Sequence, residues 1–596
     1  MGLRRIGLIA CLALAGYIGC ACGEVRAAVA YETEIHVPGD DKLADELKAS
    51  SQLVARQAAG ADSESALRRR AGADIKRLQD VTHAAGYYDA KLDYKIDQHH
   101  KPWRVIVDVR LSEPYRLREV RLIGPKGGAP PLSENFNPAN FGLQLGARAV
   151  SNMVVNGEAK ILRYYTEKGR PLAKMLGREV VIDRADHSMH VTYRIDAGPQ
   201  AMFGAAKISG LKSVDRRFVK RRLQWHEGEL YNSDKVDATQ QLLVDSNLFS
   251  VVKIAPANSV GPDGRIAMNI QLTERPPRSI GAGVYYDTST GFAARAFWEH
   301  RNLFGQGEQL HLEGVVGQSE YGALAQFRRP YFLMRDLDFR AEAAISKLTL
   351  PAYDARQASI FAGLDRRFSK TWSGGAGVEF IQADVQDATG VFTQNYGLVG
   401  VPLYVRRDTS DDLLNPTKGS RLGLTMTPFT SVDGKSISFL SAKVSASAYQ
   451  RLGRSDRFVL AGYANVGSTT GVSLADLPRN QRLYAGGGGS VRAYGYQMAG
   501  PLDAFGNPIG GLSSLELGIE LRTKITETIG LATFVDAGSV YDQSLPNLSQ
   551  KLFWGPGIGL RYYSPIGPVR FDVATPFVRR SSDGLVQVYI SLGQAF

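Results

Sequence analysis

Cysteine is almost absent from this chain. Of its 596 residues only three are cysteines, and all three (Cys11, Cys20 and Cys22) lie near the N-terminus. The rest of the chain therefore has no thiol for a disulfide, for thiolate catalysis or for a cysteine-ligated metal. Long apolar runs are missing too: beyond the N-terminus no segment has the roughly 18 consecutive apolar residues that a membrane-spanning helix needs.

The usual signatures of enzymes are also missing. The nine histidines are dispersed, and no G-x-S-x-G motif is present, which argues against an esterase. The glycine cluster Gly486–Gly489 has neither the spacing of a dinucleotide-binding loop nor the lysine of a phosphate-binding loop. We therefore expect no catalytic residue, no metal and no cofactor, and we interpret the chain as a protein that is not an enzyme.

The first residues have the pattern of an export signal. Arg4 and Arg5 precede an apolar run from residue 6 to residue 18, and Ala28-Val29-Ala30 offers the small residues of a cleavage site. The alternative is a lipoprotein cleaved before Cys20, with an unfavourable tyrosine three positions upstream. We predict that residues 1–30 are a signal peptide. An exported chain without an apolar helix is then either a soluble protein or a β-barrel.

Charge and composition point to a protein of strands and turns. The formal net charge is +12, but the basic residues are scattered, so we expect no nucleic-acid partner. Glycine (63 residues), tyrosine (26) and phenylalanine (24) are abundant, as is typical of chains rich in strands and turns.

The first half of the chain contains an internal repeat. A helical stretch, a turn and an alternating strand recur about every 80 residues, and a second strand follows each time. The turns are Gly86-Tyr87-Tyr88, Gly169-Arg170-Pro171 and Asn247-Leu248-Phe249. We predict three tandem α+β modules, each a small sheet with helices on one face, over residues 31–114, 115–202 and 203–276.

The second half, residues 277–596, has short alternating stretches in place of helical periodicity. Its length predicts about 16 antiparallel strands at roughly 20 residues for each strand and its loop. In "SLELGIELR", Leu515, Leu517, Ile519 and Leu521 share one face, and Glu516, Gly518, Glu520 and Arg522 share the other. This pattern suits a membrane barrel, and equally a soluble sandwich with a dry core. The export signal, the number of strands and the chain's ending favour a transmembrane β-barrel.

That ending is "LVQVYISLGQAF". We expect its last strand to present Val586, Val588, Ile590, Leu592 and Phe596 on one face. A final aromatic residue resembles the recognition signal of bacterial outer-membrane barrels, and the alternative is an ordinary edge strand.

Several stretches together resemble one family. "YAGGGGSVRAYGYQ" contains Val491-Arg492-Ala493-Tyr494-Gly495. This is similar to the Val-Arg-Gly-Phe/Tyr motif that Omp85-type outer-membrane proteins carry on a loop folded back inside the barrel. "TFVDAG" resembles the Phe-x-Asp motif on the family's inner wall. The three N-terminal modules resemble polypeptide-transport-associated (POTRA) domains, and Trp298–Leu310, Leu413–Leu422 and Gly555–Pro576 resemble further parts of the barrel.

The resemblance implies roles for individual residues. Arg492 is expected to lie in the lumen and to pair with acidic residues of the wall. The candidates are Asp536, in one motif with Phe534, and Glu520 on the polar face already described. Alanine replaces the family's usual glycine at position 493, which matters if that position needs a positive φ.

The resemblance also implies a function. We expect an outer-membrane insertase or translocase that assists the assembly of barrel-type and autotransporter proteins, with its modules in the periplasm of a Gram-negative bacterium. Three modules are typical of the TamA (translocation and assembly module) branch. This implies a TamB-like, inner-membrane-anchored partner at the first module, unfolded outer-membrane proteins as substrates, and contact with outer-membrane lipid. A two-partner-type secretion pore and a passive diffusion porin are the alternatives.

The mechanism that we expect is a lateral seam between the first and last barrel strands. The first strand contains Gly281 and Gly283, and the last contains Gly593 and ends at Phe596. Because glycine has no side chain to pack, we predict a weak ladder that parts sideways and offers its edge to an incoming strand. The alternative is that these glycines only accommodate barrel curvature.

Overall fold

The computed structural model describes residues 28–596 except 288–290, 435–436, 454 and 566. The predicted signal peptide therefore lies almost wholly outside the described residues. The chain divides into two compact units: one holds most of the three N-terminal modules, and the other holds segments of the third module and everything after residue 269. In the described part, no helix is long and apolar enough to span a membrane.

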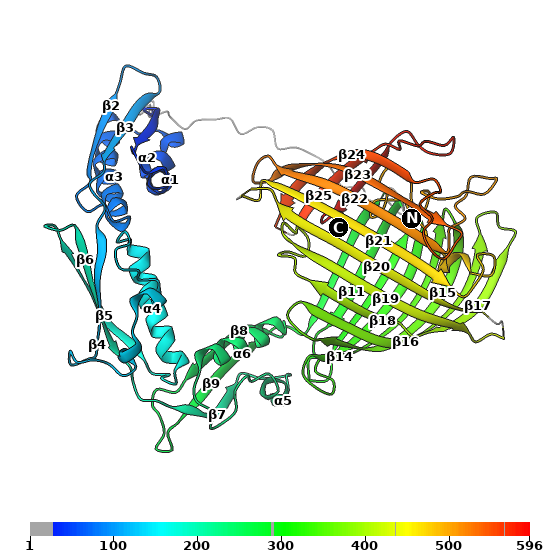
Figure 1. Cartoon of the computed structure of the whole chain (residues 1–596), viewed down its shortest axis with the longest axis horizontal. Coiled ribbons are helices and arrows are strands. Elements are labelled where there is room, and N and C mark those ends of the chain that lie inside the picture. The colour runs from blue at the N-terminus through cyan, green and yellow to red at the C-terminus, as the bar shows by residue number, and fades with distance from the viewer. Residues whose placement is uncertain (1–27, 288–290, 435–436, 454, 566) are drawn as a thin grey trace, which may run out of the picture. The chain divides into compact units, whose positions relative to one another are not determined.

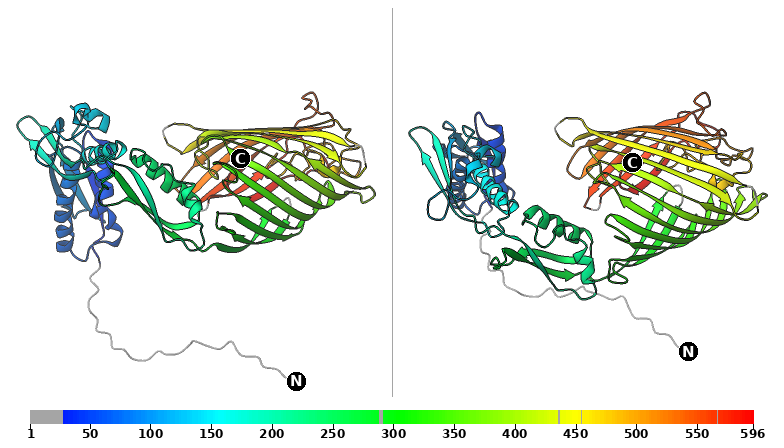
Figure 2. Two further views of the ribbon diagram at one scale, coloured as in Figure 1. Left: turned by 90° about the horizontal axis from the view of Figure 1, so that it is seen from below. Right: turned by 60° about the horizontal axis from the view of Figure 1, so that its bottom comes forward.

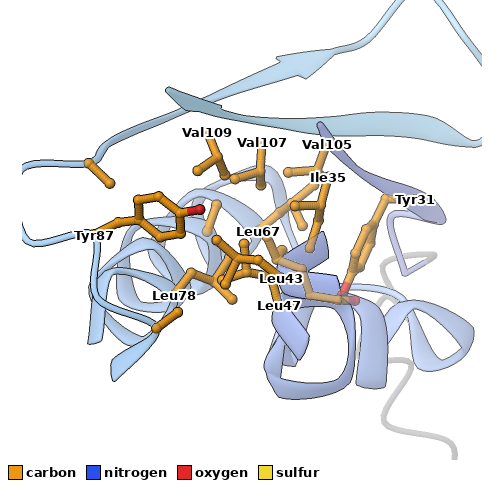
Figure 3. Close-up of a cluster of buried hydrophobic side chains, with 14 of the residues drawn as sticks. Tyr31, Ile35, Leu43, Leu47, Leu67, Leu78, Tyr87, Val105, Val107 and Val109 are labelled. Carbon is orange, nitrogen blue, oxygen red and sulfur yellow. Dashed lines mark hydrogen bonds between the residues drawn. The ribbon is translucent and has the colours of Figure 1, made fainter. Parts of the chain in front are cut away.

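The first module is a three-stranded sheet covered by helices. Its strands β1 (Tyr31–His36), β2 (Lys91–Asp97) and β3 (Trp103–Arg110) take the order β1-β3-β2, with β1 parallel and β2 antiparallel to β3. Between β1 and β2 come α1 (Asp41–Ser50), α2 (Gln52–Ala55), the 3-10 turn η1 (Gln57–Ala59) and α3 (Glu64–Ala84). The apolar stripes of α1 and α3 pack against one face of β3 (Figure 3), with Leu43, Leu47, Leu67, Leu78, Val105, Val107 and Val109 buried.

The second and third modules repeat this plan. The second has the sheet order β4-β6-β5, from β4 (Arg116–Ile123), β5 (Lys174–Asp183) and β6 (Ser188–Asp196), with η2 (Ser133–Asn135), η3 (Pro138–Phe141) and α4 (Ser151–Glu167). The third has the order β7-β9-β8, from β7 (Met202–Ser209), β8 (Phe249–Pro256) and β9 (Arg265–Glu274), with α5 (Arg216–Lys220) and α6 (Ser233–Asp245). Three α+β modules therefore precede the large sheet (Figure 1).

Polar side chains join the first module to the second. The guanidinium of Arg148 donates to the carboxylate of Asp40 at 2.7 Å and contacts the hydroxyl of Tyr87 at 3.0 Å. The Tyr115 hydroxyl donates to Asp89 at 2.6 Å. Asp40, Tyr87 and Asp89 belong to the first module and the other two residues to the second, so charge and hydrogen bonds fix this junction.

The remaining strands form one antiparallel sheet that curls into a barrel (Figures 1 and 2). Its sequential order runs from β10 to β26. The strands are β10 (Arg278–Asp287), β11 (Gly291–His300), β12 (Gln309–Gly317), β13 (Glu320–Arg329), β14 (Leu337–Leu350), β15 (Tyr353–Arg367), β16 (Trp372–Asp387), β17 (Thr393–Gly400), β18 (Leu403–Asp408), β19 (Gly419–Ser431), β20 (Ser438–Arg451), β21 (Phe458–Thr470), β22 (Ser513–Lys524), β23 (Ile529–Tyr541), β24 (Phe553–Ser564), β25 (Gly567–Ala574) and β26 (Gln587–Leu592), and the 3-10 turn η4 (Arg479–Gln481) lies between β21 and β22.

Two of these strands share a single place in the barrel wall. β17 and β18 both pair with β16 on one side and with β19 on the other. Only Val401 and Pro402 separate them, and proline interrupts a ladder because it has no N–H to donate. The 17 strands therefore occupy sixteen positions, the number expected from chain length.

Burial on the two faces separates a membrane barrel from a soluble sandwich. On β22 the side chain of Ile519 is 54% exposed, whereas Glu520 is 0% exposed. Along β23, Val535 is exposed and Asp536 is buried. A sandwich would bury the apolar face; here the wall turns its apolar residues outward and its charged residues inward, as a lipid-facing barrel does. The predicted fold class is confirmed.

Candidate functional site: the lumenal arginine and its wall

The segment between β21 and β22, residues 471–512, returns into the barrel. Its tip is Val491-Arg492-Ala493-Tyr494, and each of these residues is at most 1% exposed. Short-range hydrogen bonds hold the tip: the Tyr494 N–H donates to the Val491 carbonyl at 3.0 Å, and the Gly487 N–H to the Tyr494 carbonyl at 3.0 Å. Gly486 and Gly487 both have φ of +107°, a conformation that L side chains rarely adopt. We call residues 486–499 the lumenal tip.

Arg492 lies among three carboxylates of the wall. Its Nε and Nη2 donate to the two oxygens of Asp536 at 2.7 and 3.0 Å, a bidentate pair. Its Nη1 donates to Glu520 at 2.7 Å and to Asp572 at 3.1 Å. The guanidinium carbon also lies 3.3 Å from the ring centroid of Phe534, in the position of a cation–π contact. The structure thus brings together Arg492 and the three wall residues predicted for it, and adds Asp572.

Three further arginines extend this cluster. Arg522 donates to Glu520 at 2.8 Å. Arg561 lies between Glu520 and Asp572 and donates to both. Arg570 donates to Asp572 at 3.3 Å. We call these seven residues the charge network: Arg492, Arg522, Arg561, Arg570, Glu520, Asp536 and Asp572. Because all are buried, each charge depends on the others for stabilisation.

Glycines of the wall make room for the tip. A Cβ added to Gly538 would lie 2.7 Å from a methyl of Val491, and one added to Gly555 would lie 2.4 Å from the Ala493 methyl. A Cβ on Gly557 would meet the Phe534 ring at 2.2 Å. The glycines in "DAG" and "GPGIG" therefore serve close packing.

The alanine at position 493 fits without strain. Ala493 is not among the residues with positive φ, so its conformation is open to any L residue. Its methyl fills the space above Gly555. The departure from the usual glycine therefore leaves the geometry of the tip intact.

The four predicted seam residues lie in different surroundings. A Cβ on Gly281 would meet the Phe297 ring at 2.4 Å, so this glycine has a packing role, whereas Gly283 has no atom within 4 Å of such a Cβ. Gly593 has φ of +87° and follows the last residue of β26. The expectation that Phe596 shares the outer face with Ile590 is wrong: its ring lies 4.6 Å from that of Tyr463. Tyr463 points into the lumen, where its hydroxyl donates to the carbonyl of Ser490 in the lumenal tip at 2.7 Å. Phe596 turns inward because the positive φ at Gly593 ends the alternation of β26.

Comparison with known proteins identifies the barrel. Residues 302–596 match the Omp85 superfamily domain. The barrel of this chain is an Omp85 superfamily domain. It is 24% identical over 441 residues to the outer membrane protein assembly factor BamA of Nitratidesulfovibrio vulgaris, with 71% of this chain and 54% of that protein covered. It is 22% identical over 602 residues to BamA of Neisseria meningitidis serogroup B, with 88% and 72% covered. The chain thus spans about half the length of the first of these relatives.

A solved structure has the same fold. The crystal structure of BamA from Haemophilus ducreyi lacking POTRA domains 1–3 is similar with a TM-score of 0.67 and 19% sequence identity, covering 80% of this chain and 99% of that one. The two BamA relatives are named outer membrane protein assembly factors, in agreement with the location expected from the sequence.

Sequence reasoning did not single out Asp572 and the three supporting arginines of the Omp85 barrel. All four alternate with outward apolar residues, as in "RFDVA" and "GLRYY". That alternation predicts an inward side chain. It does not reveal that β22, β24 and β25 direct theirs to one point.

Proposed function

We propose that this Omp85 protein is an outer-membrane insertase or translocase that assists the assembly of barrel-type and autotransporter proteins through a lateral seam between β10 and β26. The proposal rests on one observation: in the part of the chain that the structure describes, the first and last strands of the sheet are not joined by a ladder. The order of hydrogen-bonded strands begins at β10 and ends at β26, with no β10–β26 ladder among the pairings of the described residues. A closed barrel protects every strand edge from lipid, so an interrupted ladder is the place where an edge can open.

Two features support this location. β26 has only six residues, whereas β14, β15 and β16 have 14 to 16. A cavity of about 960 Å³ is lined by the lumenal tip, by Tyr286 of β10, and by Ile590 and Leu592 of β26. Because Ile590 and Leu592 lie on the outward face, this cavity extends from the lumen to the seam. An incoming strand would find there an edge to pair with, by β-augmentation.

The test is to close the seam reversibly. Tyr286→Cys and Ile590→Cys line the same cavity and can be joined by a reducible bifunctional reagent. We expect the joined protein in liposomes to stop assembling a substrate barrel and to recover after reduction. The matched control joins Ile519→Cys to Val535→Cys, two outward residues that face each other on β22 and β23. Full assembly by the seam-joined protein would refute the proposal.

We propose further that the first module contacts a TamB-like, inner-membrane-anchored partner, as in the three-module branch of the family. The support is the number of modules together with the exposed edge strand β2, where Lys91, Asp93 and Lys95 face solvent. A photo-crosslinking residue at Lys95 should capture such a partner, and the same residue at Lys253 of the third module should not. Equal capture from both positions would contradict the assignment.

A further inference from the structure

The turn between β18 and β19 is built as a rigid hook. Asp411 accepts hydrogen bonds from the N–H and hydroxyl of Thr417 at 2.8 and 2.6 Å and from the Lys418 N–H at 3.1 Å. Arg451 of β20 also donates to Asp411, at 3.1 Å. Asp412 accepts from the N–H groups of residues 414 and 415 at 2.8 and 2.7 Å. These bonds present residues 413–416 as a fixed projection, which we call the β18–β19 hook.

The hook contacts the end of the chain. After Gly593 the backbone leaves the sheet, and the Gln594 N–H donates to the carbonyl of Leu414 at 3.0 Å. The side-chain amide of Gln594 donates to the amide oxygen of Asn415 at 2.9 Å. A side-chain methyl of Leu414 lies 3.6 Å from a Cβ placed on Gly593. The hook therefore binds the backbone and the side chain of the residues that follow β26, 179 positions along the chain.

The same residues reach the charge network. Arg561 donates to the amide oxygen of Gln594 at 3.0 Å, so this side chain bridges hook and network. Arg522 donates to the carbonyl of Pro416 at 3.2 Å and to that of Phe596 at 3.4 Å. Both arginines also hold Glu520, the partner of Arg492. The segment 593–596 is thus held between a turn from the middle of the sheet order and the arginines behind the lumenal tip.

We propose that the β18–β19 hook is a positioning element for the edge strand: it holds segment 593–596 inside the lumen and thereby limits the movement of β26. Its functional consequence rests on the seam proposed above. When the hook is engaged, the Leu414 carbonyl occupies the Gln594 N–H, a donor that β26 would otherwise present at its end. Release of the hook frees this donor and leaves β26 attached through its six-residue ladder with β25 and its contacts with the lumenal tip.

The test measures the position of the end of β26 in the full chain in lipid nanodiscs. Spin labels at Leu592→Cys and Ile519→Cys, both outward and more than half exposed, report the distance between β26 and β22 by pulsed electron resonance. We expect one narrow distribution in the parent protein. Asn415→Ala with Gln594→Ala removes the hydrogen bond between the two amides and the one from Arg561 to Gln594. Each lost bond should raise the displaced population about fivefold, so the distribution should broaden.

Leu413→Ala is the matched control. Leu413 neighbours the contact residue, but its side chain is 76% exposed, so its loss should leave the distribution narrow. Leu414→Ala, which keeps every backbone hydrogen bond, is the second contact variant if the double variant fails to fold. Broadening in the contact variants alone supports the proposal. A distribution as narrow as that of the parent, or equal broadening with Leu413→Ala, overturns it.

This distance measurement is independent of the assembly assay. If the seam-joined protein still assembles substrates, the proposed function fails while the hook remains measurable. If the seam is required but the contact variants do not broaden, the hook alone fails. Where the seam and the hook both function as proposed, we expect the contact variants to assemble substrates faster or less selectively.

Discussion

Replacing Arg492 by alanine would leave three buried carboxylates without their shared partner. Glu520, Asp536 and Asp572 are each 0% exposed. Arg522, Arg561 and Arg570 still form ion pairs with Glu520 and Asp572. Among the described residues, however, Asp536 forms an ion pair with Arg492 alone. Removing one member of a buried pair costs about 3–5 kcal/mol, which is roughly two to three and a half powers of ten in an equilibrium constant. We expect this cost to favour a tip withdrawn from the wall, while the strand ladders and the barrel persist.

Hydrogen exchange of the lumenal tip in lipid nanodiscs measures this directly. The Gly487 N–H donates to the Tyr494 carbonyl within the tip, and the Ala499 N–H donates to the Ala485 carbonyl at its base. Their protection reports the docking equilibrium. Arg492→Lys keeps the charge but loses the bidentate geometry and should lie between parent and alanine variant. Arg482→Ala is the control, because Arg482 donates to the carbonyls of residues 477 and 509 and has no ion pair among the residues that the structure describes. Unchanged protection in Arg492→Ala, or an equal loss in Arg482→Ala, would refute the reasoning.

Three other predictions use the same molecule. Gly555→Val should displace the tip and strain the wall behind it, because a Cβ there would lie 2.4 Å from the Ala493 methyl and 2.2 Å from the carbonyl oxygen of Thr575. Gly283→Ala, with nothing within 4 Å, should be silent in the same exchange experiment. Ala493→Gly should keep the docked tip and lower its stability by only about 0.4–1 kcal/mol, through the freedom of the undocked chain; undocking of the tip would contradict the ordinary φ at this position. Burial raises the pKa of Asp40, but hydrogen bonds, that from Arg148 foremost, outweigh it and hold the pKa below its usual range. The stabilisation from Asp40 is thus complete above its ordinary pKa of about 3.9 and is lost only as pH falls below it. The protection factors of amides at the first module junction, which are corrected for the intrinsic pH dependence of exchange, should therefore be constant from pH 8 to 5 and lower throughout in Asp40→Asn.

The alternation of apolar and polar residues predicts much of the fold and part of the site. It shows which residues of β22 and β23 face the same side of the sheet, so the sequence alone directs Glu520 and Asp536 to the lumen. The repeat in the first half likewise gave three modules. These are local properties, since the period of a strand or a helix is a property of a short segment.

The parts that alternation missed depend on contacts between distant segments or on single residues. Asp572 joins the site because β25 stands two places from β23, which no local pattern states. Phe596 was misplaced because the period of two was continued through Gly593, whose positive φ ends it. Pro402 divides one strand position into two segments, and the strand count from chain length could not show where.

The position of the charge network has a mechanical consequence for the barrel. The network joins β22, β23, β24 and β25 by side-chain ion pairs. This part of the wall is therefore stabilised by ion pairs as well as by backbone hydrogen bonds. β26 contributes no charged residue to it. It is held by a short ladder with β25, by the Tyr589 hydroxyl on the Tyr494 carbonyl at 2.9 Å, and by the Arg570 contact with Ser591. On the C-terminal side of the seam, movement that preserves the buried ion pairs is therefore confined to β26 and the residues after it, which form one of the two edges of the proposed seam.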